Sequence, residues 1–196
     1  MRYGFFFHQT RCSGCQACVV ACKDWNGVKP GRAALRQLHV VETGTFVSGD
    51  FKLVNMVYSC NHCMEPACMK VCPSGAIYRE SGDSNIVIIN RDKCKGVGAC
   101  IKACPFGAPQ TPEDKQETAV LSKNTRTKGH KVMKCDACST RRAAGKVPVC
   151  VAACPQRAIE WGEYDNLAAK YGENQIAKGF PTNISTKPSI LIKSKN

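Results

Sequence analysis

The most informative stretch of the chain reads Cys60-Asn61-His62-Cys63-Met64-Glu65-Pro66-Ala67-Cys68-Met69-Lys70-Val71-Cys72-Pro73. Three cysteines on one tight loop can hold three corners of a cube of iron and sulfide. A fourth cysteine, displaced by a helical turn, points away and ligates the neighbouring cluster of a pair. The proline then ends the short helix, and a β-branched residue starts the next strand. This spacing therefore predicts paired iron–sulfur clusters.

The arrangement recurs along the chain, so an internal repeat organises the sequence. The pattern Cys-Pro-x-x-Ala closes the second, third and fourth copies, at Cys72, Cys104 and Cys154. Group one is Cys12-x2-Cys15-x2-Cys18-x3-Cys22, group two is Cys60-x2-Cys63-x4-Cys68-x3-Cys72, group three is Cys94-x2-Val97-x2-Cys100-x3-Cys104, and group four is Cys135-x2-Cys138-x11-Cys150-x3-Cys154.

Two other uses of cysteine explain the sequence less well. A disulfide scaffold is disfavoured because the 15 cysteines are odd in number and bunched, and no signal peptide opens the chain. Structural zinc needs two close pairs of ligands separated by a spacer. Group four alone fits that spacing, whereas the third cysteine of the other groups follows too closely. The four groups together therefore favour iron–sulfur clusters.

The formal net charge of +13 suggests nucleic-acid binding, but that count treats every cysteine as neutral. Fifteen thiolates would carry −15 and the cationic cluster cores would return about +7, which leaves a net charge of roughly +5. Most of the basic excess thus balances anionic clusters, and we expect no nucleic-acid partner. The longest aliphatic run, Ile86–Ile89, is far short of the roughly 20 residues of a membrane helix, so we expect no transmembrane segment.

The spacing between the groups predicts an α+β fold of small antiparallel sheets and short helices. Strands are expected at 3–8, 35–42, 51–58 and 85–90, ligand-bearing helices at 15–23, 98–104 and 137–144, and a hairpin turn at Gly82-Asp83. We expect two ferredoxin-like two-cluster units, one inserted in the other. Residues 1–59 and 132–162 form the split unit, 60–110 the inserted unit, 111–131 a surface loop, and 163–196 a C-terminal helix over 163–177 followed by an extended tail.

Stretches around the cysteines resemble a known family over nearly the whole chain. It resembles the four-cluster iron–sulfur electron-transfer subunits of molybdopterin oxidoreductases, such as that of dimethyl sulfoxide reductase. The matching stretches are Tyr3-Gly4-Phe5-Phe6, Arg11-Cys12-x-Gly14-Cys15, Ala21-Cys22-Lys23-Asp24, Ser59-Cys60-Asn61-His62-Cys63, Cys72-Pro73-Ser74-Gly75-Ala76, Ala103-Cys104-Pro105-Phe106-Gly107-Ala108-Pro109-Gln110, Lys134-Cys135-Asp136 and Thr186-Lys187-Pro188.

The resemblance implies ligand sets that cross over between groups, as in two-cluster ferredoxins. It implies three [4Fe-4S] clusters and one [3Fe-4S] cluster, with iron bound through cysteine. Site 1 is Cys12, Cys15, Cys18 and Cys154, site 2 is Cys22, Cys135, Cys138 and Cys150, site 3 is Cys60, Cys63, Cys68 and Cys104, and site 4 is Cys72, Cys94 and Cys100.

Val97 breaks the repeat, because valine has no lone pair to offer iron. Site 4 should therefore hold three irons. The family precedent agrees, since a nitrate reductase-type subunit also lacks cysteine at this corner. The alternative is a four-iron cluster whose last iron takes water, hydroxide or a nearby carboxylate such as Asp92. Lys23, Lys70, Lys95 and Lys102 flank ligands and are expected to raise the cluster potentials modestly.

The resemblance also implies the partners. Site 1 would face a molybdenum- or tungsten-pterin catalytic subunit, and site 4 would lie furthest away, near a membrane anchor or another electron carrier. The sequence contains no evident carboxylate pair, nucleophile–base set or phosphate loop, so we expect a non-catalytic subunit. The alternative is an iron–sulfur subunit of a hydrogenase or formate dehydrogenase complex. The family implies a cytoplasmic chain, or a periplasmic one exported with a signal-bearing partner.

Overall fold

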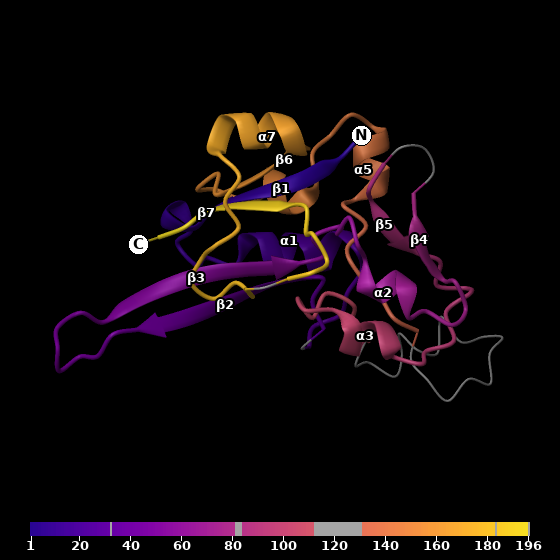
Figure 1. Ribbon diagram of the computed structural model, residues 1–196, viewed down its shortest axis with the longest axis horizontal. Coiled ribbons are helices and arrows are strands. Elements are labelled where there is room, and N and C mark those ends of the chain that lie inside the picture. The colour runs from indigo at the N-terminus through magenta and orange to yellow at the C-terminus, as the bar shows by residue number, and fades with distance from the viewer. Residues whose placement is uncertain (32, 81–83, 112–130, 183, 196) are drawn as a thin grey trace.

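The computed structural model describes residues 1–31, 33–80, 84–111, 131–182 and 184–195 (Figure 1). Small sheets and short helices make up an α+β fold, as the sequence predicted. The elements are β1 (Tyr3–His8), η1 (Gln9–Arg11), α1 (Ala17–Trp25), β2 (Arg36–Thr43), β3 (Lys52–Ser59), α2 (Ala67–Lys70), β4 (Ile77–Arg79), β5 (Val87–Ile89), α3 (Ala99–Ala103), α5 (Ser139–Ala143), α6 (Val149–Ala152), β6 (Ile159–Glu163), α7 (Tyr164–Tyr171) and β7 (Ile190–Lys193).

The largest sheet has the strand order β6-β1-β7 and draws on both ends of the chain. Its central strand β1 carries three buried phenylalanines, Phe5–Phe7. The pair β1·β6 is antiparallel, with Tyr3 opposite Glu163. The pair β1·β7 is parallel, with Phe5 opposite Ile190, so the expectation of antiparallel sheets is wrong for this pair. The long connection through α7 allows the tail to return in the parallel direction.

The tail is an integral part of the core. The side chains of Ile190, Leu191 and Ile192 are 3%, 0% and 2% exposed, because β7 covers the second edge of β1. Helix α7 lies over the same sheet and buries Tyr164 and Leu167 (Figure 1). It ends at Tyr171, earlier than the predicted position 177, because the next residue, Gly172, has a positive φ of 78°.

The strands β2 and β3 form an antiparallel ribbon that projects from the body of the molecule (Figure 1). The base of the ribbon lies against the cysteine loops, where the Asn55 side chain donates a 2.9 Å hydrogen bond to the Cys12 carbonyl. Its tip exposes Phe46 and Val47. The ribbon therefore supports group one at its base and presents apolar side chains at its far end.

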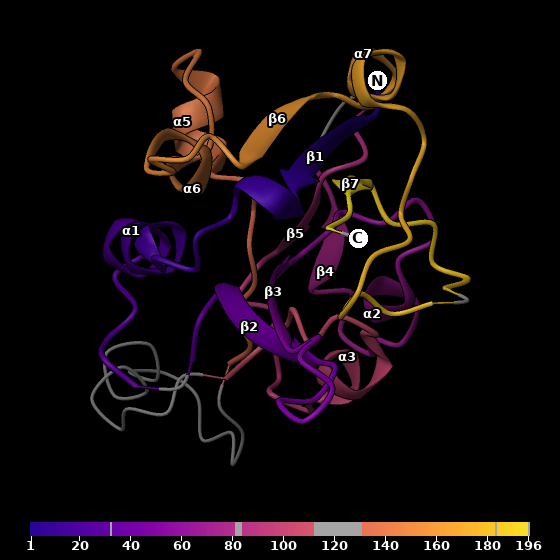
Figure 2. The same cartoon turned by 90° about the vertical axis from the view of Figure 1, so that its left-hand side faces the viewer.

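Two antiparallel strand pairs join the cysteine groups in the same manner: in each pair, one strand precedes one group and its partner strand follows another group. Strand β1 precedes group one and pairs with β6, which follows group four. Strand β5 precedes group three and pairs with β4, which follows group two. Helices α1 and α6 pack together, as do α2 and α3, and Figure 2 shows these two helix sets on opposite sides of the molecule.

Parts of two predictions lie outside the described residues. These are the Gly82-Asp83 turn and residues 112–130 of the predicted surface loop. The predicted helices at 15–23, 98–104 and 137–144 correspond to α1, α3 and α5, each slightly shifted or shorter.

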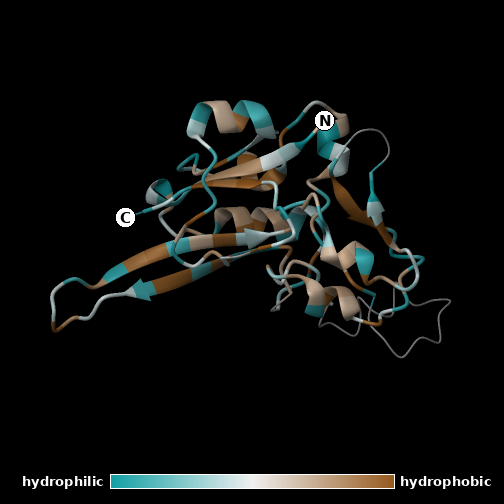
Figure 3. Ribbon diagram, in the orientation of Figure 1, coloured by the Kyte–Doolittle hydropathy of each residue, from teal (hydrophilic) through white to brown (hydrophobic). Residues whose placement is uncertain are grey.

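The apolar core includes cysteine side chains. Cys18 and Cys150 pack in the main cluster with Phe5 and Met56, and Cys60 and Cys135 form a smaller cluster. Hydrophobic residues run along β5, β7 and parts of the β2·β3 ribbon (Figure 3). Within the described residues, no helix is long and apolar enough to cross a membrane.

Candidate iron–sulfur centres

The four cysteines of site 1 line one cavity. Cys12 follows η1, Cys15 lies on the loop, Cys18 lies in the first turn of α1, and Cys154 arrives from the end of α6. Leu38 and Val57, from the base of the ribbon, line the same cavity. Cysteines from opposite ends of the sequence are thus brought to one apolar chamber.

The cysteines of site 3 line a second cavity. Three of them come from group two and Cys104 comes from group three. Burial raises the pKa of Cys63 to about 11 and that of Cys68 to about 12, and the thiolates of Cys60 and Cys104 add to both shifts. Cys60 is buried and the other three cysteines are half-buried, so four thiols face one cavity largely away from water.

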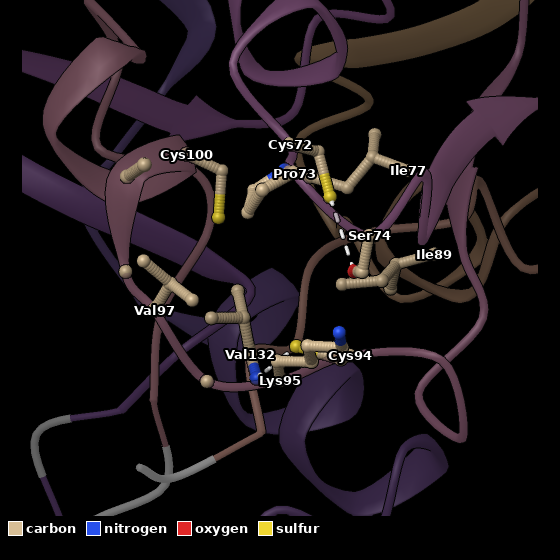
Figure 4. A pocket seen from close by; sticks show the side chains of 13 residues that line it. Cys72, Pro73, Ser74, Ile77, Ile89, Cys94, Lys95, Val97, Cys100 and Val132 are labelled. Atoms are coloured by element: carbon tan, nitrogen blue, oxygen red, sulfur yellow. Dashed lines mark hydrogen bonds between the residues drawn. The ribbon is translucent and has the colours of Figure 1, made fainter.

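The cysteines of site 4 line a third cavity (Figure 4). The sulfurs of Cys72, Cys94 and Cys100 face this cavity, and Val97 lies on its wall between Cys94 and Cys100. The Cys72 sulfur lies 3.7 Å from the Ser74 hydroxyl. This site therefore offers three cysteine thiolates, and the side chain of Val97 stands at the position of the fourth.

The cysteines of site 2 also gather, although they come from groups one and four. Burial raises the pKa of Cys22 to about 12, and the thiolates of Cys150 and Cys138 add to the shift. Burial likewise raises the pKa of Cys135, with Cys22 the first neighbouring thiolate to add to it. Group four is therefore not a self-contained set, because its last cysteine, Cys154, lines the site 1 cavity instead.

The backbone of each cysteine loop has the same left-handed residue. The second residue after the first cysteine has a positive φ in all four groups. Such a residue turns successive backbone N–H groups toward one side, which forms a cradle for an anion. In group four, the Ala137 N–H donates to the Cys135 sulfur at 3.3 Å. The four residues are Gly14 (76°), His62 (43°), Gly96 (68°) and Ala137 (56°).

A second cradle follows each Cys-Pro pair. The Ala158 N–H donates to the Cys154 sulfur at 3.3 Å, and backbone N–H groups at Ala76 and Ala108 act in the same way on Cys72 and Cys104. At Cys72, burial raises the pKa, but hydrogen bonds from the Ile77 N–H, from the Ser74 hydroxyl and N–H, and from the Ala76 N–H outweigh it, and the pKa is lowered. Hydrogen bonds from backbone N–H groups stabilise thiolate and sulfide charge.

These sites fit iron–sulfur clusters better than free thiols. Isolated buried thiolates are unfavourable, and most of the cysteine pKa values are accordingly raised. Coordination by cationic iron would hold all four thiolates of a site deprotonated. The three cavities are walled by cysteines together with apolar and backbone groups, as an anionic cluster bound through thiolates requires.

Comparisons with known proteins agree with this geometry. A family model described as a 4Fe-4S dicluster domain matches residues 52–164, and one described as a 4Fe-4S binding domain matches residues 9–25. The B subunit of the anaerobic dimethyl sulfoxide reductase of Escherichia coli (strain K12) is 38% identical, over 98% of this chain and 88% of that protein. The chain belongs to the iron–sulfur subunit family of the dimethyl sulfoxide reductases.

Other curated proteins are also similar over nearly the whole of this chain. The B subunit of the anaerobic dimethyl sulfoxide reductase of Haemophilus influenzae is 36% identical over 98% of this chain and 89% of that protein. Protein NrfC of Escherichia coli (strain K12) is 33% identical over 97% of this chain and 79% of that protein. The chain is therefore an iron–sulfur electron-transfer subunit of the dimethyl sulfoxide reductase type.

Asp92, which sequence reasoning offered as a fourth ligand at site 4, does not line the cavity. Its side chain is 100% exposed, and its carboxylate lies 3.8 Å from the Lys131 ammonium. Lys70 is also directed elsewhere, since it pairs with Glu65 at 2.9 Å on the surface. Of the flanking lysines, Lys95 lines a cavity, that of site 4.

Sequence reasoning missed two buried cations. Arg36, the first residue of β2, is 3% exposed, and Lys134, directly before Cys135, is 5% exposed. Lys134 donates to the Val87 and Cys135 carbonyls and lines the site 3 cavity. The sequence does contain a signal for the buried arginine, because Arg36 follows the apolar run Ala33-Ala34-Leu35. An arginine in such a buried segment is stable only beside negative charge.

Proposed function

We propose that this chain relays single electrons through three [4Fe-4S] clusters and one [3Fe-4S] cluster, to or from a molybdopterin catalytic subunit. One observation carries the proposal. Each of three cavities is lined by one set of cysteines, and each of these sets combines cysteines from two groups in the way that ferredoxin ligands cross over. The clusters would supply one-electron transfer, and the chain would supply the thiolates, the N–H cradles and the apolar walls.

The ligands proposed for the clusters are the cysteines of sites 1 to 4. Groups one and four each give their last cysteine to the other group's site. Cys154 of group four lines the site 1 cavity, and Cys22 of group one lies near Cys138 and Cys150 of site 2. Cys104 at site 3 and Cys72 at site 4 support the same exchange between groups two and three. The two strand pairs β1·β6 and β4·β5 support the division into a split unit (1–59 and 132–162) and an inserted unit (60–110).

Contacts between the sites support a single path for electrons. Cys18 of site 1 and Cys150 of site 2 pack in one apolar cluster. Cys135 of site 2 and Cys60 of site 3 belong to one small group of buried apolar side chains. Cys68 of site 3 packs beside residues of site 4. Cys63 and Cys104 of site 3 also pack against the cluster of Cys18 and Cys150. Sites 1, 2 and 3 therefore share apolar clusters, and site 4 joins them through site 3.

The three-iron assignment at site 4 rests on Val97. Its side chain lies on the cavity wall where the repeat has cysteine elsewhere, and Asp92 points into solvent. An aliphatic corner provides no ligand for a fourth iron. The three thiolates of site 4 match the requirement of a three-iron core.

The partner is proposed from the relatives, two of which are named as subunits of anaerobic dimethyl sulfoxide reductases. Cys15 of site 1 is exposed, which suits an electron exit toward a catalytic subunit. Site 4, at the other end of the path, would face a membrane anchor or another electron carrier. The pterin metal would be molybdenum or tungsten.

Anaerobic purification of the tagged chain with its natural partners tests this function. The expected result is a brown complex that contains a pterin-bearing subunit and whose clusters are reduced by dithionite and reoxidised by a substrate of that subunit. A nickel–iron hydrogenase without pterin as the partner would contradict the proposal and favour the alternative complex. A colourless chain that contains zinc would contradict both.

A further inference from the structure

Arg36 is a buried cation in the middle of the cysteine sites. It begins β2, pairs in register with Ser59, and is 3% exposed. The guanidinium carbon lies 4.9 Å from the centre of the Phe5 ring, so an aromatic face covers it from the sheet. Among the residues that the structure describes, its Nη2 atom has no hydrogen-bond partner.

The charges that act on Arg36 belong to cysteines of two sites. In order of strength they are Cys150, Cys18, Cys135 and Cys22, of which Cys18 belongs to site 1 and the other three to site 2. In the described part of the chain, Arg36 forms no ion pair with a carboxylate. A buried arginine requires a compensating negative charge, and here the thiolates of these four cysteines supply it.

We propose that Arg36 sets the reduction potential of the site 2 cluster, and to a smaller extent that of the site 1 cluster, by stabilising their reduced states. This inference rests on the proposed function, because it requires clusters at both sites. A cluster that accepts one electron from a donor becomes more negative by one unit, and a fixed buried cation favours that state. Arg36 keeps its proton throughout, so the step transfers an electron alone.

The chain offers a matched control at site 3. Lys134 is also buried and lines that cavity, and its charge acts on Cys68 and Cys104. It is not among the charges that act most strongly on Cys22 or Cys135 of site 2. The two cations thus serve different clusters, and removing each should shift a different potential.

The test is a dithionite titration of the holo complex, followed by electron paramagnetic resonance at low temperature. The variants are Arg36→Met, Arg36→Lys and Lys134→Met, and the site 2 signal is identified by its loss or change in Cys22→Ser. In Arg36→Met, we expect the site 2 cluster to become harder to reduce by about tenfold, which is about 59 mV for a one-electron couple. The site 1 cluster should shift less in the same direction, and sites 3 and 4 should not shift.

Two further results are expected. Arg36→Lys should restore most of the potential, because the charge is retained. Lys134→Met should shift site 3 more than site 2, although Lys134 also donates to the Cys135 carbonyl. Unchanged site 2 potentials in Arg36→Met, with full cluster content, would overturn the inference. A merely structural role would lower cluster content or thermal stability without moving the potential. If Arg36→Met assembles too little cluster, Arg36→Gln, which keeps amide donors and removes the charge, is titrated with the same criteria.

Failure of the proposed function looks different in this experiment. In that case the wild-type complex would lack four reducible clusters, whatever residue stands at position 36. A wild-type complex with all its clusters and an Arg36→Gln variant with unaltered potentials would instead reject the inference and leave the proposed function intact.

Discussion

Arg157 and Gly107 occupy the same position of the repeat, three residues after a cysteine that precedes proline, and both have a left-handed backbone, with φ of 48° and 59°. Gly75 occupies the corresponding position after Cys72, also with φ of 59°. The turn at this position directs the next N–H toward the cysteine sulfur, as Ala158 does for Cys154. A left-handed conformation costs a residue with a Cβ atom roughly 1–2 kcal/mol. Group four therefore carries a conformational cost that groups two and three avoid.

Replacing Arg157 with glycine should stabilise the holo protein. The Arg157 side chain is exposed, so its removal costs little packing, and relief of the left-handed strain should raise the free energy of unfolding by about 1 kcal/mol. Anaerobic thermal unfolding of Arg157→Gly measures this. The reciprocal control is Gly107→Ala, where the added Cβ would contact nothing within 4 Å, so only the backbone cost remains. A lower melting temperature for Arg157→Gly, or an unchanged one for Gly107→Ala, would contradict the argument.

Replacing Cys22 with serine should damage the cluster held by Cys135, Cys138 and Cys150. Cys22 is 5% exposed and its thiolate lies among those of site 2, although its sequence neighbours belong to site 1. Electron paramagnetic resonance of the reduced Cys22→Ser complex should show an altered or missing site 2 signal and an intact site 1 signal. Cys15→Ser is the matched variant and should show the reverse. Damage confined to site 1 in Cys22→Ser would refute the crossed assignment.

Replacing Val97 with cysteine should convert site 4 into a four-iron site. Val97 is 65% exposed and lies between Gly96 and Gly98, which already have the left-handed φ values of 68° and 75°, so the substitution needs little rearrangement. A three-iron cluster has an odd electron count when oxidised and is paramagnetic before reductant is added, whereas an oxidised four-iron cluster of the ordinary kind is silent. The oxidised wild type should therefore show a signal that Val97→Cys lacks. Val97→Ala should keep it, and its loss there would speak against the assignment.

Removing the clusters should abolish cooperative unfolding. Cys18 and Cys150 belong to the main apolar core and Cys60 and Cys135 to another, so cluster loss leaves cavities and buried thiols inside the molecule. After treatment with an iron chelator, we expect a large loss of ellipticity and no sigmoidal thermal transition. Iron with sulfide should restore the transition, and zinc should not. A cooperative transition in the iron-free chain would show that the protein core suffices by itself.

Local sequence patterns predicted much of the secondary structure. Strands expected at 3–8 and 51–58 correspond to Tyr3–His8 and Lys52–Ser59, because runs of β-branched and aromatic residues require little tertiary context. The helix predicted over 163–177 was too long, since the glycine at 172 ends it despite a continuing amphipathic pattern. The crossed cysteine sets stay a prediction that three cavities support.

Features that depend on distant segments were not predictable. The parallel pairing of Leu191 with Phe6 joins residues from opposite ends of the chain, and only the folded path of the tail determines its direction. The burial of Arg36 likewise depends on cysteines from groups one and four, which the sequence places far apart. The residue type at position 157 gives no signal for a left-handed backbone. Groups two and three have glycine at the matching position, which adopts this conformation readily, whereas group four has arginine.

The most direct test of the account is anomalous X-ray scattering at the iron edge from crystals of the anaerobic complex. Iron peaks should lie inside the cavities of sites 1, 3 and 4 and among the four cysteines of site 2, about 15 in this chain. Sites 1 to 3 should show four irons each, and site 4 should show three, with no peak beside Val97. A fourth iron beside Val97, peaks in fewer than four places, or scattering at the zinc edge instead would contradict the four-cluster account.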